Sequence, residues 1–178
     1  PAETITLRQL EVVLPSHVTP AFLEQPPQLH DDESFELLVN ETGAWLKAQG
    51  FSGVHAGLET FAQLTVKVGT KVICNSTRTV VHGRPRFPYR GIMIDSARHF
   101  QPVDAILKVL DGMAASGLNT LHWHITDSQS FPWNSTRAPL MVRGAYRPDL
   151  VYQRRDLERV VAYAADRAIR VLPEIDMP

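Results

Sequence analysis

The stretch that decides the fold is residues 119–126, with the sequence NTLHWHIT. Its apolar and polar side chains alternate, which is typical of a β-strand whose two faces have different surroundings. One face, which we expect to pack against helices, carries the large apolar side chains Leu121, Trp123 and Ile125. The opposite face, toward the interior of the sheet, carries Thr120, His122 and His124. Because buried polar groups are costly unless they are paired, the sequence predicts a functional site on that second face.

Strand and helix patterns alternate on both sides of this stretch. The apolar run 91–95 predicts a strand buried on both faces. Pro102 starts a helix with one apolar stripe, and Gly117 fits its C-terminal cap. A second such helix spans 157–168, and a third strand spans 170–176. This order predicts an α/β fold with a parallel sheet, either a barrel or a doubly wound sheet. Since no glycine-rich turn follows the first strand, a dinucleotide-binding fold is disfavoured.

The preceding part of the chain has a different pattern and predicts a small α+β domain. Strands are expected at 5–14, 34–39, 44–48 and 71–74. Gly50 and Gly53 separate the third strand from a helix whose apolar residues are Val54, Leu58, Phe61, Ala62 and Leu64. The segment 83–88, rich in proline and arginine, then predicts a linker. The expected domains are therefore 1–83 and 84–178.

The composition excludes several classes of protein. With 178 residues, of which 44% are hydrophobic and 21% are charged, the chain is not a disordered tail. A net charge of −1 gives no basic surface for nucleic acid. No stretch approaches the roughly 20 apolar residues that cross a bilayer, and the first residues do not form a signal peptide. The single cysteine, Cys74, excludes an internal disulfide and is expected in the core.

Asparagine usage points to the secretory pathway. Three of the four asparagines begin an Asn-X-Ser/Thr triplet, the acceptor pattern of N-linked glycosylation: Asn40, Asn75 and Asn134. We therefore expect a lysosomal or secreted protein.

Polar residues end each of the three strands predicted after residue 88. In a parallel α/β fold the functional site lies at the carboxyl ends of the strands. The candidates there are Asp95, Ser96, Arg98, His99, His122, His124, Asp127, Glu174 and Asp176. The His122-X-His124 pair has two interpretations: a metal-binding pair, or imidazoles that orient carboxylates. A third metal ligand is not evident nearby. The carboxylates Asp127, Glu174 and Asp176 are either acid–base groups or orienting groups.

Several blocks of the sequence resemble one known family in the same order. They are 87–100 (FPYRGIMIDSARHF), 117–127 (GLNTLHWHITD), 130–132 (SFP), 144–146 (GAY) and 167–178 (RAIRVLPEIDMP). These blocks are similar to the catalytic barrel of glycoside hydrolase family 20, the β-N-acetylhexosaminidases. Residues 57–64 (GLETFAQL) resemble a helix of that family's accessory domain. The resemblance implies an α+β accessory domain followed by the first three β/α units of a (β/α)8 TIM barrel.

The resemblance also implies roles for individual residues. Arg90 matches an arginine that hydrogen-bonds hydroxyls of the terminal sugar, and Asp127 matches an aspartate that organises the site. Asp176 matches an acidic residue before a Pro-Gly-His turn, and His124 and Glu174 are expected to support the site. No residue of this chain matches the general acid, which is expected downstream of Pro178, so the chain alone is expected to be inactive. Ser128 stands where many relatives have a second aspartate.

The implied reaction is substrate-assisted hydrolysis with retention at the anomeric carbon, without a metal or organic cofactor. The expected partners are glycans that end in N-acetylglucosamine or N-acetylgalactosamine, together with the remainder of the barrel from the same or another polypeptide. The resemblance allows a homodimer. Two alternatives remain open: a non-catalytic sugar-binding or interaction module, and a metal hydrolase that uses His122 and His124.

Overall fold

The computed structural model describes residues 5–19, 25–74 and 78–176. The chain forms two compact units, Pro1–Pro88 and Tyr89–Pro178, each of which is treated by itself below. The sequence placed the division five residues earlier, after residue 83.

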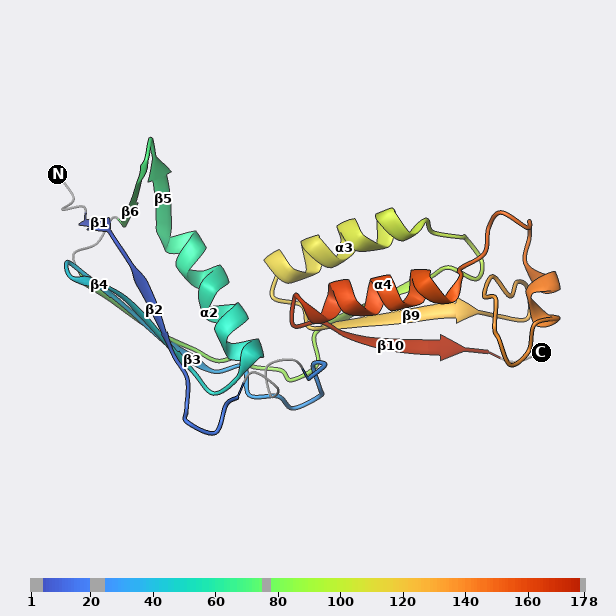
Figure 1. The fold of residues 1–178 in the computed structure, drawn as a ribbon, viewed down its shortest axis with the longest axis horizontal. Helices are drawn as coiled ribbons and strands as arrows, with labels where there is room; N and C mark the ends of the chain where they lie inside the picture. The colour runs from blue at the N-terminus through green and yellow to red at the C-terminus, as the bar shows by residue number, and fades with distance from the viewer. Residues whose placement is uncertain (1–4, 20–24, 75–77, 177–178) are drawn as a thin grey trace. The chain divides into compact units, whose positions relative to one another are not determined.

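The second unit is built on a parallel three-stranded sheet (Figure 1). Strand β9 (Thr120–Thr126) lies between β8 (Gly91–Asp95) and β10 (Arg170–Ile175). Helix α3 (Val103–Ala115) connects β8 to β9, and α4 (Arg154–Ala165) precedes β10. All five elements lie where the sequence predicted them, and the predicted parallel α/β arrangement is confirmed. Gly117 follows α3 with a φ of 68°, the left-handed conformation expected of a glycine after a helix.

The two helices cover one face of this sheet, and the core of the unit lies between the helices and the sheet (Figure 1). The predicted apolar face of β9 is buried, since Leu121, Trp123 and Ile125 are at most 1% exposed. They pack with buried side chains of both helices: Ile106, Leu110, Met113, Val160 and Ala164. Fully burying one such aliphatic side chain contributes about 1.5–3 kcal/mol. Because these apolar side chains must face the helices, the alternate residues His122 and His124 of β9 lie on the opposite face of the sheet.

The prediction that 91–95 is buried on both faces is wrong for the described chain. Ile92 is 37% exposed and Met93 is 55% exposed. Among the described residues β8 pairs only with β9, and both helices lie on one face of the sheet. Met93 lies beside His122 on the other face, where Leu172 of β10 is also exposed.

Within its described residues, the first unit contains two sheets and one helix. A four-stranded sheet has the order β2 (Leu10–Val13), β4 (Gly43–Ala48), β3 (Phe35–Asn40) and β7 (Arg78–Gly83). A three-stranded sheet has the order β1 (Ile5–Leu7), β6 (Lys71–Cys74) and β5 (Thr65–Val68). Helix α2 (Phe51–Leu64) packs on β3 and β4 (Figure 1).

Three details of this unit differ from the sequence prediction. The predicted strand 5–14 is two strands in different sheets, because β1 pairs with β6 whereas β2 pairs with β4. Gly53 lies inside α2, where the close approach of the chain at Ser34 leaves no room for a side chain. Strands β5 and β7 were not predicted. Cys74, by contrast, is a free thiol that is 2% exposed in the core, as predicted.

Among the described residues, every helix is too short or too polar to cross a bilayer.

The contact at Gly53 gives a prediction with a matched control. A Cβ at position 53 would lie 2.6 Å from the carbonyl oxygen of Ser34, whereas a Cβ at Gly112 in α3 would meet nothing within 4 Å. We expect Gly53→Ala to destabilise the full-length protein by about 1–3 kcal/mol through overpacking. Gly112→Ala should stabilise it by about 0.5–1 kcal/mol. Urea unfolding measures both, and equal effects of the two substitutions would contradict this packing.

Candidate active site

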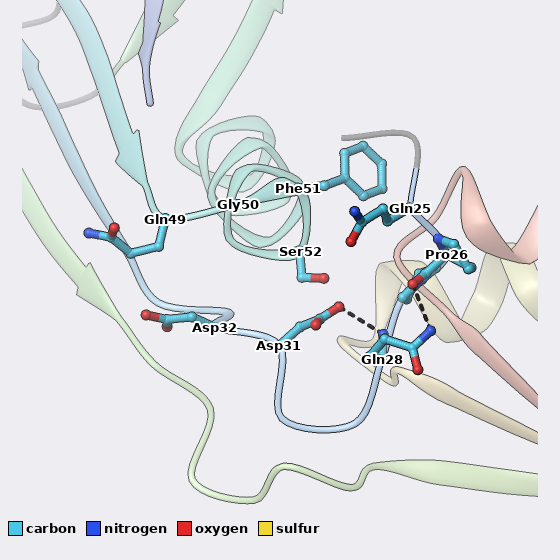
Figure 2. A pocket seen from close by; sticks show the side chains of 10 residues that line it. Gln25, Pro26, Gln28, Asp31, Asp32, Gln49, Gly50, Phe51 and Ser52 are labelled. Atoms are coloured by element: carbon cyan, nitrogen blue, oxygen red, sulfur yellow. Dashed lines mark hydrogen bonds between the residues drawn. The ribbon is translucent and has the colours of Figure 1, made fainter. Parts of the chain in front are cut away.

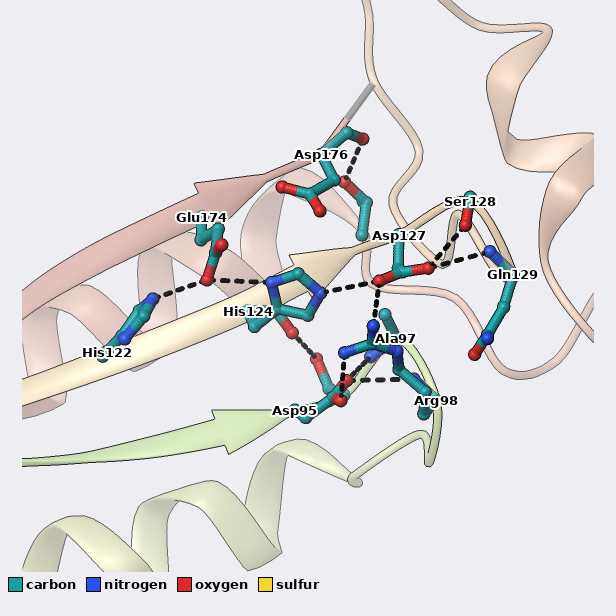
Figure 3. Close-up of polar contacts among 12 residues, drawn as sticks. Asp95, Ala97, Arg98, His122, His124, Asp127, Ser128, Gln129, Glu174 and Asp176 are labelled. Atoms are coloured by element: carbon teal, nitrogen blue, oxygen red, sulfur yellow. Dashed lines mark hydrogen bonds and ion pairs between the residues drawn. The ribbon is translucent and has the colours of Figure 1, made fainter. Parts of the chain in front are cut away.

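The carboxyl ends of β8, β9 and β10 bring a group of polar side chains together (Figure 3). We call this group the carboxyl-end cluster: Asp95, Arg98, His122, His124, Asp127, Glu174 and Asp176. The parallel register creates it, because Asp95 of β8 and Glu174 of β10 both pair with His124 of the central strand. Of the further candidates, Ser96 is buried behind the cluster, and its backbone N–H donates to the carbonyl oxygen of His124.

Glu174 joins the two histidines of β9. Its Oε2 lies 2.6 Å from Nε2 of His122 and 2.9 Å from Nδ1 of His124. Both imidazoles therefore share one carboxylate oxygen across the strand pair. The hydrogen bond from His124, followed by that from His122, holds the pKa of Glu174 below its ordinary value. This geometry favours the interpretation in which the His-X-His pair orients carboxylates.

His124 is held between two carboxylates. Its side chain is 5% exposed, and its second nitrogen, Nε2, lies 3.3 Å from Oδ2 of Asp127. Burial alone favours the neutral ring, but the hydrogen bonds to Glu174 and Asp127 outweigh it and raise the pKa of His124. A doubly protonated imidazolium can donate to both neighbours at once, which a neutral ring cannot do.

Asp127 accepts hydrogen bonds at both carboxylate oxygens. Oδ1 accepts from the backbone N–H of Gln129 at 3.0 Å and from the hydroxyl of Ser128 at 2.9 Å. Oδ2 accepts from Arg98 and His124. The Gln129 bond is the largest of the causes that lower the pKa of Asp127. This carboxylate is therefore an ionised acceptor, and Ser128 completes its surroundings.

Arg98 links two strands of the site, and sequence reasoning did not select it as a binding residue. Its Nη1 lies 2.8 Å from Oδ2 of Asp95, and its Nη2 lies 2.6 Å from Oδ2 of Asp127. The side chain is 44% exposed. Two of its five N–H groups therefore hold the cluster together, and the guanidinium still faces solvent. Its position three residues after an acidic strand end was the signal that could have identified it.

Arg90 is not part of this cluster. It precedes β8 at the amino end of the strand, and its Nε donates to the carbonyl oxygen of Gly117 at 2.7 Å. Its backbone carbonyl accepts from Asn119 and Thr120. The structure thus gives Arg90 contacts at the end of the sheet opposite to Asp127, and its expected sugar contact stays a prediction.

Asp176 belongs to a group of three side chains, with His124 and Asp127, that could hold a metal ion. It is the one such group among the described residues. Oxygens of Asp127 and Asp176 and a nitrogen of His124 lie within 4.8 Å of one another. However, His124 and Asp127 are already bonded to each other, and the Arg98 guanidinium bonds the same oxygen of Asp127, Oδ2. A divalent cation there would displace or repel a fixed positive charge, so the donor set fits an ion pair better than a metal.

A small pocket of about 110 Å³ lies in the first unit, at the start of α2 (Figure 2). Its wall includes Ser52 and the loop 25–32, where the backbone N–H of Gln28 donates to Oδ2 of Asp31 at 2.8 Å. Its lining contains no residue of the carboxyl-end cluster, so we give this pocket no part in the candidate active site.

The structure describes two of the three predicted glycosylation sites. Asn40 lies at the end of β3, beside the turn to β4. Asn134 lies in the long loop after β9, and its Nδ2 donates to Oε1 of Gln153 at 2.9 Å. Asn75 lies outside the described residues.

Comparison with known proteins identifies the family. Residues 87–178 match the model described as glycosyl hydrolase family 20, catalytic domain. The chain belongs to glycosyl hydrolase family 20. It is 47% identical over 173 residues to β-hexosaminidase subunit beta of Mus musculus. The aligned residues make up 96% of this chain and 32% of that protein. It is 45% identical over 154 residues to a chitooligosaccharidolytic β-N-acetylglucosaminidase of Bombyx mori, covering 83% of this chain and 26% of that protein.

Solved structures of family 20 share the fold. A chitobiase of Flavobacterium johnsoniae superposes with a TM-score of 0.77 and 32% identity over 95% of this chain and 24% of that chain. The chain spans about a third or less of the length of the relatives named here. The resemblance stated from the sequence is therefore confirmed at the level of the family.

The bonds of His124 predict how stability depends on pH. Because the pKa of His124 is raised above 6.5, its stabilising effect is complete below pH 6.5 and is lost as pH rises through the raised pKa. The pKa of Glu174 is lowered from 4.5, so its effect is complete above pH 4.5 and is lost as pH falls through the lowered value. We expect His124→Gln to lower the free energy of unfolding of the full-length protein by about 1–3 kcal/mol between pH 4.5 and pH 6.5. The loss should be smaller at lower and at higher pH.

Urea unfolding of the wild type and His124→Gln over a pH series measures this difference. His82→Gln is a matched control, because the His82 side chain is 73% exposed and its one carboxylate neighbour, Glu36 at 3.7 Å, is exposed as well. A His124 difference that stays constant from about pH 5 to pH 9 would contradict the charged bridge.

Proposed function

We propose that the protein containing this chain is a β-N-acetylhexosaminidase that removes terminal N-acetylhexosamine residues from the non-reducing ends of glycans. The observation that carries the proposal is the carboxyl-end cluster, which lies where parallel α/β enzymes place their active sites. Membership of family 20 and the names of the most similar relatives support it. The substrates proposed are glycans or glycoconjugates ending in N-acetylglucosamine or N-acetylgalactosamine.

The reaction proposed is substrate-assisted. The oxygen of the substrate's 2-acetamido group attacks the anomeric carbon, and the bond to the leaving oxygen breaks as a general acid protonates that oxygen. The pKa values of Asp95, Asp127 and Glu174 are all lowered, so these groups are poor proton donors at neutral pH. The family resemblance matches no residue of this chain to the general acid, so we assign that role to a residue of the full-length protein outside this chain.

The chain's own residues bind and orient the substrate in this proposal. Arg98 is the binding residue that the geometry supports best, since its planar group of donors is exposed beside Asp127 and suits paired sugar hydroxyls. His124 and Glu174 are positioning residues that hold Asp127, and Asp176 lies at the rim of the same site. No metal or organic cofactor takes part.

We also propose that residues 84–178 are the first three β/α units of a (β/α)8 barrel, preceded by an accessory domain in residues 1–83. Met93 and Leu172 support this, because both are exposed apolar residues on the sheet face that carries His122. The interior of a closed barrel would cover them, whether the remaining strands come from the same or another polypeptide. We further propose a lysosomal or secreted location, which the mammalian relatives and the glycosylation triplets support, and an assembly that can include a homodimer.

Activity assays test this function directly. The full-length protein should hydrolyse a chromogenic N-acetyl-β-glucosaminide or N-acetyl-β-galactosaminide, whereas residues 1–178 alone should be inactive. The matched control is the corresponding glucoside, which lacks the acetamido group and should not be cleaved. Equal turnover of the glucoside would contradict substrate assistance. Binding of the sugar without turnover by the full-length protein would favour a non-catalytic module, and loss of activity on chelation with recovery by zinc would favour a metal hydrolase.

Paired arginine variants test the binding residue. Arg98→Lys keeps the charge but loses the planar donor geometry, so kcat/KM should fall roughly 10- to 150-fold. Arg90→Lys should change kcat/KM by less than about threefold, because the Arg90 side chain bonds a backbone carbonyl at the far end of β8. Thermal unfolding of both variants checks that they fold. A large loss of kcat/KM with Arg90→Lys and none with Arg98→Lys would instead support Arg90 as the sugar-binding arginine, as the family resemblance implied.

A further inference from the structure

The turn between β3 and β4 presents a glycosylation triplet in an ordered conformation. Asn40 pairs with Gly43 across the hairpin. The backbone N–H and the hydroxyl of Thr42 both donate to Oδ1 of Asn40, at 2.8 Å and 2.6 Å. This Asx-type turn fixes the side-chain amide through its oxygen. The amide nitrogen Nδ2 has no hydrogen-bond partner among the described residues, so it remains available for attachment.

An apolar surface lies on the same side of the sheet as Asn40. Alternation along β3 and the strand register place three apolar side chains on the face opposite α2, and we call them the outer patch: Leu38, Trp45 and Val80. Leu38 pairs directly with both others, and Val80 is 46% exposed. The opposite face of the sheet is the buried one, since Leu37, Val39 and Leu46 have no exposed surface.

The Trp45 ring extends from the outer patch toward the turn. A Cβ built on Gly43 would lie 3.5 Å from Cη2 of Trp45, so the far edge of the ring lies over Gly43. Gly43 is the residue opposite Asn40, and directly opposed residues have Cβ positions about 4.5–5.5 Å apart. The indole Nε1 donates to Oε2 of Glu11 at 3.1 Å, which holds the ring in this orientation. A sugar attached to Asn40 would therefore meet the ring.

We propose that Asn40 carries an N-linked glycan whose first N-acetylglucosamine packs on Trp45 and covers the outer patch. In the modification, Nδ2 of Asn40 forms a bond to C1 of the sugar, and the bond from C1 to the diphosphate of a lipid-linked oligosaccharide breaks. The amide loses one proton, and the lipid diphosphate leaves. The apolar face of the sugar ring then removes exposed apolar surface from water, which stabilises the hairpin.

Asn134 provides a contrast within the same chain. Its Nδ2 donates to Oε1 of Gln153, the residue that caps α4 together with Asp156. In the described part of the chain Asn134 lies outside the strands, so no strand register sets an apolar side chain opposite it. A glycan at Asn134 would have to be accommodated at that capping contact, so occupancy should be higher at Asn40.

Site occupancy is the first test, and it rests on the secretory location proposed above. The full-length protein is secreted from cultured eukaryotic cells, treated with peptide-N-glycosidase in ¹⁸O water, and analysed by peptide mass spectrometry. We expect labelled Asp at position 40. Thr42→Ala should abolish the label and Thr42→Ser should keep it. An unmodified Asn40 beside an occupied Asn75 or Asn134 would overturn this proposal alone. Absence of glycan from all three triplets would overturn it together with the proposed location.

Packing of the sugar on Trp45 is the second test. Removal of the glycan should lower the Tm of the wild type by about 2 °C or more, and by less than half as much in Trp45→Thr. If removal of the glycan lowered the Tm equally in the wild type and in Trp45→Thr, the proposed packing of the sugar on Trp45 would be overturned. NMR of protein with labelled sugar needs no variant: protons of the first N-acetylglucosamine should shift upfield because of the indole ring current. Shifts equal to those of a free glycopeptide would overturn the proposal.

Discussion

The carboxyl-end cluster depends on the bridge that His124 makes between Glu174 and Asp127. A buried imidazole with two hydrogen-bonding nitrogens is costly unless both are satisfied, and here each faces a carboxylate oxygen. The bridge joins β10 to the turn after β9, and Arg98 extends it to β8 through Asp127. The parallel pairing of the strands and the charge balance of the site therefore support each other.

The backbone around the cluster is fastened to the core by a second set of contacts. The indole of Trp123 donates to the hydroxyl of Ser96 at 2.9 Å, directly behind the site. Tyr152 is fully buried and stacks on Phe100 with ring centroids 4.6 Å apart. Burial raises the pKa of the Tyr152 phenol to about 12, and its hydroxyl donates to the carbonyl oxygen of Gln101. The loops that carry Arg98 and Asp127 thus rest on packed aromatic rings.

The sequence predicted well those elements whose pattern is local. The alternation of β9 separates Trp123 from His124 without knowledge of any partner strand, and the apolar stripe of α3 is continuous along the chain. Two kinds of feature were not predictable in this way. The division of 5–14 into β1 and β2 depends on pairing with residues more than thirty positions away. The role of Arg98 depends on Asp127, which lies 29 positions further along the chain, directly after β9.

The two-residue period of β9 also has a consequence for how such a protein can change through evolution. Residues that stabilise the unit and residues that carry the site alternate along one strand, on opposite faces. The side chains of His122 and His124 lie on the face opposite to Leu121, Trp123 and Ile125, so a substitution on one face removes no side chain from the other. Selection on the polar face and selection on the core face therefore act largely on different residues of one strand, and His124 is the exception because its buried ion pairs also stabilise the fold.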